Sequence, residues 1–371
     1  MAFRNRLWKN VCFIVSAVAF CTSLEAGVTL PDLDSASQRR AEVRTARLYE
    51  AKWGVFTHFL SYGCKTPEEW NARVDGFDVK RMVGQVKRVG ARFYFMTIMQ
   101  GQRFLLGPNA TYDRYTGLKP GEGCSRRDLV VELSEELDRA GIDLYLYFTG
   151  DGPWADKELA PKFGFAPRRE NVPDVFVEKW AAVLKEYAVR YGDRVKGWWI
   201  DGAYRWFKYT DAQLQLYVDA VRCGNPSALI AFNEYGVTDY FQNSFVGADF
   251  TAGEFNDFTV LPHSRFVNGL QAFALIPLGD YKDPKSVGSS WDAPGLKHPA
   301  DYTASFVKLF NMNGGIVAID VHHDDKGGID PQHLSVLEAV GKATRTITDV
   351  VSPEDVLPNS LSNRTEKEKQ K

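Results

Sequence analysis

The sequence lacks several features that would assign it to a common class of protein. It contains no GxxxxGK[ST] motif, so it has no phosphate-binding loop of that type. Its 45 Lys and Arg residues are offset by 47 Asp and Glu residues, which gives a formal net charge of −2. No basic tract stands out, which argues against a nucleic acid partner. After the first twenty residues, no segment approaches ~18 unbroken apolar residues, so we expect no membrane span in the mature chain.

Cysteine is also scarce, with five residues in 371. Cys12 and Cys21 fall within the first 26 residues, and Cys64, Cys124 and Cys223 are far apart in the rest of the chain. They form no CxxC motif and no disulfide framework. One bridge among the three stays open as an alternative, but we expect buried free thiols.

The N-terminus has the pattern of a secretory signal peptide. Basic residues precede the ten-residue apolar run VCFIVSAVAF (11–20), and small residues follow it. The run is too short to span a bilayer. We therefore predict a signal peptide over residues 1–26 and a secreted or periplasmic protein without membrane attachment after cleavage; an uncleaved anchor is the alternative. Residues 351–371 are polar and are predicted to be a disordered tail.

Between these ends, apolar strand-like segments alternate with amphipathic helical segments. This alternation predicts an α/β fold, a (β/α)₈ TIM-like barrel over residues 27–350. The crossover between the fifth and sixth strands is weak, so its helix is expected to be degenerate, and an incomplete barrel is the alternative. The predicted strands are 52–58, 91–97, 142–148, 197–201, 228–232, 246–251, 270–276 and 315–321, and the predicted helices are 78–89, 127–140, 174–191, 211–222, 300–311 and 331–343.

Polar side chains follow several of these strands, at the end where barrel enzymes hold their catalytic groups. Asp201 ends the apolar strand GWWIDG (197–202), and Glu254 follows the sixth strand in GADFTAGEF (247–255). His58, Asp320 and His322 also stand at strand ends. Two carboxylates facing each other across an apolar cleft can hydrolyse a glycosidic bond. The rival acids for the second position are Glu234, Asp249 and Asp257.

Several segments, in the correct order, resemble the α-L-fucosidase family of retaining glycoside hydrolases over nearly the whole barrel. They include KWGVFTHFLSYG (52–63), GWWIDG, DFTAGEF (249–255) and NGGIVAIDVHHDDKGGIDP (313–331). The resemblance implies that Asp201 is the nucleophile and that Glu254 is the general acid/base. It also implies a glycan substrate and no cofactor.

The resemblance further implies a set of sugar-binding residues, with some departures from the family pattern. In place of the family's His-His-Asp-Gly-Phe run after the second strand, this chain has MQGQRF (99–104), and FNEYG (232–236) stands where the family has an arginine. The residues expected to bind substrate are His58, Glu69, Trp70, Gln100, Gln102, Tyr147, Trp199 and Trp291.

A metal site is not expected. His322, His323, Asp324 and Asp325 form a cluster of metal-binding residue types, but adjacent side chains on a strand face opposite sides. The sequence thus predicts a secreted, metal-independent retaining exo-glycosidase that releases terminal α-L-fucose or a related sugar by double displacement. The alternatives are a glycosidase with another sugar specificity and a catalytically inactive carbohydrate-binding barrel.

Overall fold

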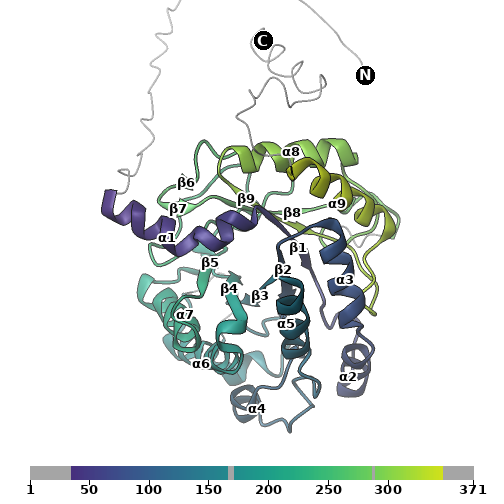
Figure 1. Ribbon diagram of the computed structural model, residues 1–371. Coiled ribbons are helices and arrows are strands. Elements are labelled where there is room, and N and C mark those ends of the chain that lie inside the picture. Colours follow the sequence, from purple (N-terminus) through teal and green to yellow (C-terminus); the bar gives the residue numbers. More distant parts are fainter. Residues whose placement is uncertain (1–34, 166–170, 286–288, 346–371) are drawn as a thin grey trace, which may run out of the picture. The chain divides into compact units, whose positions relative to one another are not determined.

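A curled sheet of seven parallel strands forms the centre of the fold (Figure 1). The computed structural model describes residues 35–165, 171–285 and 289–345, so the predicted signal peptide and the polar tail lie outside the described residues. The strand order is β5-β4-β3-β2-β1-β9-β8, so the first and last strands of the chain pair with each other. The strands are β1 (Trp53–Thr57), β2 (Phe93–Thr97), β3 (Asp143–Thr149), β4 (Val195–Asp201), β5 (Leu229–Phe232), β8 (Phe273–Pro277) and β9 (Ile316–Asp320).

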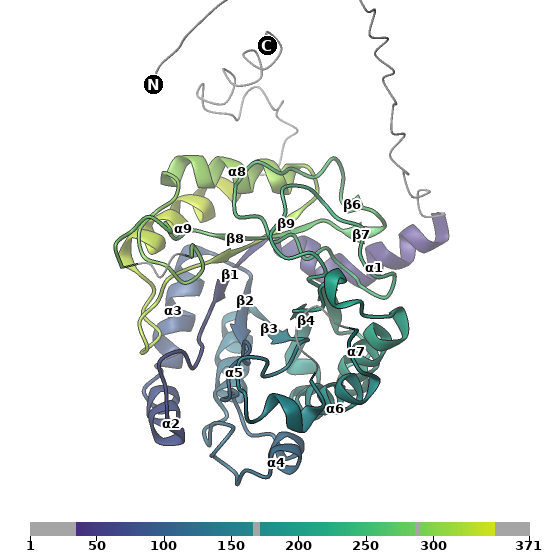
Figure 2. The ribbon, with the colours of Figure 1, turned by 180° about the vertical axis from the view of Figure 1, so that it is seen from behind.

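Helices cover the outside of this sheet (Figures 1 and 2). All six predicted helices are present, and α1, α2 and α4 were not anticipated from the sequence. The helices are α1 (Ser35–Ala51), α2 (Pro67–Asp75), α3 (Val79–Val89), α4 (Ala110–Thr116), α5 (Leu129–Ala140), α6 (Asp174–Tyr191), α7 (Asp211–Gly224), α8 (Ala300–Met312) and α9 (Pro331–Thr344). Within the described residues, no helix is long and apolar enough to cross a membrane.

Local sequence signals explain where these helices begin and end. The Asp78 side chain accepts a hydrogen bond from the Arg81 amide at the start of α3, and Gly90 ends the helix in the left-handed conformation at φ 84°. Between these caps, five apolar residues recur at helical spacing and are buried against the sheet: Val79, Met82, Val83, Val86 and Val89. The period of 3.6 residues therefore identifies the buried face of this helix correctly.

The interior of the curled sheet is filled by alternate residues of the strands. Because strand side chains alternate between faces, residues two apart along each strand point inward. The inward set is largely aromatic: Phe56, Phe93, Phe95, Tyr145, Tyr147, Trp199, Leu229, Ala231, Phe273, Leu275, Ile316 and Ala318. Helix α1 adds Leu48 and Ala51 to this cluster, and its Arg47 pairs with Asp143 at the start of β3, so α1 packs against the amino ends of the strands (Figure 1).

The predicted sixth strand, 246–251, is not a regular strand. The edges of the sheet are β5 and β8, and residues 233–265, all of which the structure describes, contain no helix, as expected for a degenerate crossover. The segment 249–255 instead lies between the two edges and is joined to them by isolated backbone hydrogen bonds. Asp249 donates to Ile230 O at 2.8 Å, and Leu275 donates to Gly253 O at 2.8 Å. The prediction of eight regular strands is therefore wrong at this position, because isolated bridges at Phe250 and Glu254 stand there in place of a continuous ladder.

The predicted seventh strand is also divided. It is split into β7 (Leu270–Gln271), which pairs with β6 (Phe266–Val267) in a small antiparallel ribbon, and β8 of the main sheet. The change of partner occurs at Ala272, whose amide donates to Arg265 O at 2.8 Å. The continuous apolar run thus predicted one strand, whereas its two parts pair in two different sheets.

The three cysteines of the described chain are free thiols, as expected, but only Cys124 is buried. Cys64 is half-buried and Cys223 is exposed on α7, so the expectation that all three are buried is wrong.

Gly253 fixes the backbone immediately before Glu254, and we expect this position to be intolerant of a side chain. Its φ is +56°, and a Cβ atom there would lie 1.9 Å from Phe273 O. Gly253→Ala should therefore lower the free energy of unfolding by roughly 2–3 kcal/mol, measured by denaturant titration. Gly84→Ala is the matched control, because nothing lies within 4 Å of its added Cβ on α3. Equal stability of the two variants would contradict the described backbone.

Candidate active site

The polar residues of the site follow the aromatic layer along the chain. They occupy the next inward-facing position of each strand. Asp201 comes two residues after Trp199, Asn233 two after Ala231, and His58 two after Phe56. The same alternation that fills the barrel therefore aims these side chains at one space above it, at the carboxyl ends of the strands.

Asp201 is a buried carboxylate held by three close hydrogen bonds. Its Oδ2 accepts from the Tyr147 hydroxyl at 2.5 Å, and its Oδ1 accepts from the Tyr204 hydroxyl at 3.0 Å and from Asn233 Nδ2 at 2.9 Å. Gln100 Nε2 approaches Oδ2 at 3.5 Å. Donors from four segments thus fix the orientation of this side chain.

Asn233 connects Asp201 with Glu254. Its Nδ2 donates to Asp201 Oδ1 at 2.9 Å and to Glu254 Oε2 at 2.6 Å. These two distances laid end to end mean that the two carboxylate oxygens lie at most about 5.5 Å apart. Asn233 is itself fixed, because its Oδ1 accepts from the Gly236 amide and its own amide donates to Ile200 O. Two acids from distant parts of the chain therefore share one amide group.

Glu254 has an electrostatic environment that favours its protonated form. Burial of its carboxyl group and, next, the negative charge of Asp201 raise its pKa to about 8, against the opposing effect of the Asn233 hydrogen bond. The side chain keeps partial access to solvent through the pocket, but protein atoms otherwise surround it. At neutral pH, Glu254 therefore carries a proton that it can donate.

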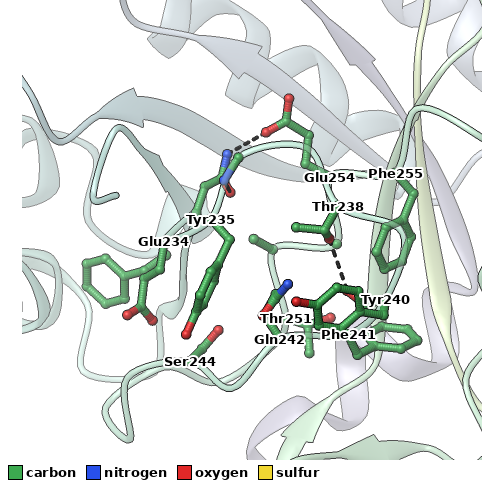
Figure 3. A pocket seen from close by; sticks show the side chains of 15 residues that line it. Glu234, Tyr235, Thr238, Tyr240, Phe241, Gln242, Ser244, Thr251, Glu254 and Phe255 are labelled. Atoms are coloured by element: carbon green, nitrogen blue, oxygen red, sulfur yellow. Dashed lines mark hydrogen bonds between the residues drawn. The ribbon is translucent and has the colours of Figure 1, made fainter. Parts of the chain in front are cut away.

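Two cavities meet at Glu254, and their sizes decide which can bind a ligand. One has a volume of about 560 Å³ and is lined by both Asp201 and Glu254. This volume lies within the range of small-molecule sites, about 300–1,000 Å³. The other is about 20 Å³, room for roughly one water molecule, and is lined by the loop around Tyr235, Thr238 and Ser244 (Figure 3). The larger cavity is therefore the candidate active site, and we call it the acid pocket.

The rival acids of the sequence analysis do not line the acid pocket. The Glu234 carboxylate points in a different direction from that of Glu254 (Figure 3), and it pairs with Arg205 at 2.7 Å. Asp249 binds Arg44 and Arg222 below the sheet edge, and Asp257 is exposed. Of the four candidates, only Glu254 faces Asp201.

The opposite wall of the acid pocket carries His58 and His322, each bound to an aspartate. His58 Nδ1 lies 2.7 Å from Asp320 Oδ1, and His322 Nδ1 lies 3.0 Å from Asp292 Oδ1. Burial opposes protonation of His58, but the charge and hydrogen bond of Asp320 outweigh it and raise the pKa of His58. The hydrogen bond that His322 makes to the Asp292 carboxylate raises the pKa of His322 despite partial burial.

Seven of the ten predicted site residues line the acid pocket, and three do not. The structure brings into the acid pocket both predicted acids and five of the predicted substrate-binding residues: Asp201, Glu254, His58, Gln100, Tyr147, Trp199 and Trp291. Glu69 instead completes the capping box of α2 with Thr66, and Trp70 is fully buried with its indole N–H donated to Leu105 O. Gln102 does not line the pocket either.

Sequence reasoning missed several residues of this site. Asn233 and Tyr204 both bind Asp201, and Tyr62, Asp292 and Lys285 line the pocket. The inward alternation from Ala231 would have identified Asn233, whereas no local signal marks Tyr204 or Asp292. Among residues 35–165, 171–285 and 289–345, no group of three or more His, Cys, Asp or Glu side chains is placed to hold a metal ion.

Comparison with known protein families shows which family this chain belongs to. The sequence model of the family described as alpha-L-fucosidase matches residues 35–346, which include every residue of the acid pocket. The chain belongs to the alpha-L-fucosidase family. Members of this family are glycoside hydrolases. No curated protein sequence is significantly similar to the chain.

Solved structures with a similar fold include two endo-fucoidan hydrolases and an alpha-L-fucosidase. The endo-fucoidan hydrolase MfFcnA9 from glycoside hydrolase family 107 has a TM-score of 0.62 at 14% identity, covering 84% of this chain and 65% of that chain. MfFcnA4, of the same family, has a TM-score of 0.61 at 14% identity, covering 83% of this chain and 54% of its own length. A variant of alpha-L-fucosidase AlfC in complex with Fuca(1,6)GlcNAc has a TM-score of 0.56 at 17% identity, covering 81% and 97%. The chain thus spans about half to two thirds of the two endo-hydrolases, and at these identities the likeness shows the fold alone.

Proposed function

We propose that this protein is a retaining exo-glycosidase that removes terminal α-L-fucose or a related sugar from a glycan. The observation that supports it most strongly is the Asn233 side chain shared by Asp201 and Glu254. Carboxyl groups stand about 5–5.5 Å apart in retaining glycosidases and about 6.5–9.5 Å apart in inverting ones. The upper limit of about 5.5 Å between the two bridged oxygens lies below the range of inverting enzymes, which favours retention.

The chemistry divides into two steps. In the first, an Asp201 oxygen bonds to the anomeric carbon while Glu254 gives its proton to the departing glycosidic oxygen, so a glycosyl ester forms on Asp201. In the second, Glu254, now a carboxylate, takes a proton from water as the water oxygen bonds to the anomeric carbon and the ester bond breaks. Two displacements on opposite faces return the sugar in its original configuration, with both acids restored.

A closed floor favours action at the end of a glycan chain. The buried side chains of Tyr147, Trp199 and Leu275, which belong to the inward aromatic layer, line the pocket. Below that layer, α1 packs against the amino ends of the strands. A sugar can therefore enter from one side only, so the enzyme would take a terminal residue.

The proposal of fucose or a related sugar is based on the family and on the residues that this chain has in the wall of its pocket. Two of the similar structures are named for fucoidan hydrolysis, and one is named for a fucose-containing ligand. In this chain, Gln100 stands beside Asp201, with Tyr62 donating to its Oε1 at 3.1 Å. An amide there reads different hydroxyl patterns from an imidazole, which makes a non-fucose sugar the second candidate.

A screen of 4-nitrophenyl glycosides of fucose, galactose, arabinose and rhamnose, in both anomeric forms, tests this function. We expect release of nitrophenol from an α-linked sugar, with α-fucoside the best substrate. Proton NMR of the first turnover should show the α-anomer of the free sugar before it mutarotates. Initial release of the β-anomer would contradict retention, and binding of a sugar without any turnover would indicate the inactive barrel instead.

Asn233→Ala should lower kcat/KM by about 10–100-fold on any substrate that the wild type hydrolyses, because the two acids lose their shared donor. The hydrogen bond from Asn233 lowers the pKa of Glu254, so its loss should move the alkaline limb of the pH profile upward. Asn243→Ala, in the exposed part of the same loop, is the control. A variant with wild-type rate and an unmoved limb would show that the bridge is unimportant.

We also propose export of the protein, based on the leader pattern of residues 1–26. N-terminal sequencing of the protein recovered from the native host's periplasm or medium should give a start between about residues 23 and 27. Recovery of an intact N-terminus in the cytoplasm would oppose this.

A further inference from the structure

His58 and His322 follow the neighbouring strands β1 and β9, and both line the acid pocket. Strands β1 and β9 are parallel, with Phe56 paired to Asp320, and the Val321 amide donates to Phe56 O at 3.1 Å. Continuing this register by two residues places His58 opposite His322. Because residues two apart point to the same side, both imidazoles follow the inward side chains Phe56 and Asp320 toward the acid pocket, which both of them line.

His322 is held in this position by a set of contacts that its neighbours provide. Its Nδ1 lies 2.8 Å from the Asp292 carbonyl oxygen and 3.0 Å from Asp292 Oδ1. Its amide donates to His333 Nδ1 at 3.0 Å, and the Asp292 amide donates to Asp320 Oδ2 at 2.8 Å. The same Asp320 binds His58 through its other oxygen. One network of hydrogen bonds therefore sets the orientation of both imidazoles.

The backbone of Asp292 is unusual in a way that serves this arrangement. Its φ is +48°, in the left-handed region that few residues other than glycine adopt. In this conformation its amide, carbonyl and carboxylate all face β9 and its end, where they bind Asp320 and His322. This backbone conformation at positive φ is typical of residues that hold a functional group in place.

We propose that His322, held by Asp292, is a second sugar-binding histidine that works beside His58 and contributes to sugar specificity. This inference rests on the proposed function only in that the acid pocket binds a sugar. The chemistry follows from the tautomer. Two acceptor oxygens at Nδ1 require the proton there, which leaves Nε2 as the ring nitrogen for a ligand. Within the described residues, Nε2 makes no hydrogen bond.

A sugar hydroxyl suits this nitrogen in either protonation state. Neutral imidazole accepts a hydrogen bond from the hydroxyl at Nε2, and imidazolium donates one to it. The two imidazoles, which follow neighbouring strands, can therefore each form a hydrogen bond with a different hydroxyl of one sugar ring. After β2, the segment MQGQRF places only Gln100 in the lining of the pocket. The two histidines line the pocket after β1 and β9.

The test uses His322→Ala with the aryl glycoside that the wild type hydrolyses best and with its monodeoxy analogues. We expect KM to rise about tenfold while kcat changes by less than about twofold, because a contact made equally in the ground and transition states is lost. One deoxy analogue should be about 10-fold worse for the wild type but no worse than its parent for the variant. A purely structural role would lower the Tm without this selective loss. His263→Ala is the control, since His263 is exposed outside the pocket.

Asp292 is tested as the positioning residue. Asp292→Asn keeps an acceptor for Nδ1 and should retain most of the affinity, whereas Asp292→Ala should approach the effect of His322→Ala. Combining Asp292→Ala with His322→Ala should add little to either change alone, because both act through one imidazole. Additive effects would overturn the positioning role.

Thermal shift assays with free monosaccharides, L-fucose among them, separate this inference from the hydrolase proposal. If the wild type hydrolyses nothing but binds a sugar in a manner that depends on His322, the histidine assignment stands and the hydrolase proposal fails. If the wild type hydrolyses a glycoside and His322→Ala has wild-type KM for it and for every deoxy analogue, the histidine assignment fails and the hydrolase proposal stands. If the wild type binds no sugar at all, both fail.

Discussion

Asp201→Gly should lower kcat/KM by about 10,000-fold or more on any aryl glycoside that the wild type hydrolyses, as expected when the group that bonds to the substrate is removed. The carboxylate is buried at the end of β4 and is held by Tyr147, Tyr204 and Asn233. Its loss removes the atom that bonds to the anomeric carbon, and the other acid besides Glu254 among the described pocket residues, Asp292, binds His322. The rate is measured by nitrophenol release under conditions where kcat/KM is directly observed.

A small anion should restore part of this activity. Glycine leaves a space into which azide can enter and bond to the anomeric carbon from the face that Asp201 occupied. The product would be a glycosyl azide of inverted configuration, identified by NMR, since only one displacement occurs. Asp239→Gly, in the exposed loop before Tyr240, is the matched control and should keep the wild-type rate. Wild-type activity of Asp201→Gly, or rescue with retained configuration, would contradict the nucleophile assignment.

Glu254→Gln should have an effect that depends strongly on the leaving group. Natural glycans and alkyl glycosides need a proton on the departing oxygen, so their kcat/KM should fall by about 100–10,000-fold. The leaving group of a 2,4-dinitrophenyl glycoside departs without protonation, so the rate of the first step with this substrate should change little. Measuring kcat/KM across aryl leaving groups of different acidity should give a steep dependence for the variant and a shallow one for the wild type.

The pH profile should report the same group. Glu254 acts in its protonated form in the first step, and its pKa is raised to about 8 by burial and by Asp201. The kcat/KM of the wild type should therefore be maintained at neutral pH and should fall as the pH rises through about 8, because the acid loses its proton. This alkaline limb should be absent from Glu254→Gln. Glu68→Gln, on the exposed surface of α2, should leave both the limb and the leaving-group dependence unchanged.

A specific alternative would overturn the assignment of Glu254. Glu234→Gln should lower stability through its ion pair with Arg205 but should not change the leaving-group dependence. If Glu234→Gln instead gave the steep dependence and Glu254→Gln did not, the acid/base would lie on the other side of the loop.

The fold was predictable where a segment buries one face with a regular period. The apolar pattern of α3 and the run ending at Asp201 gave the correct elements, because burial alone determines them. The segment 246–251 was mispredicted as a strand, because this part of the chain forms only an isolated bridge, at Phe250, and the chain then turns through Gly253 at positive φ. Contacts of this kind are made by residues distant in sequence and leave no periodic pattern.

The candidate site was predictable to the extent that it lies on strand ends. Asp201, His58 and Asn233 occupy positions that the two-residue alternation aims inward, although the last of these was not recognised. Glu69 and Trp70 show the limit of transferring residues by resemblance: the structure uses one as a helix cap and the other as buried core. Asp292 and Tyr204 come from loops, whose course depends on packing that no local motif records.

The most direct test of a paired Asp201 and Glu254 is trapping of the glycosyl-enzyme. A 2-deoxy-2-fluoro glycosyl fluoride of the preferred sugar slows both steps but keeps a good leaving group, so the covalent intermediate should accumulate. Mass spectrometry of the intact protein should then show one added fluoroglycosyl group, and peptide mapping should place it on Asp201. An enzyme that turns over its aryl glycoside yet gains no such group, or that carries it on another residue, would contradict the account.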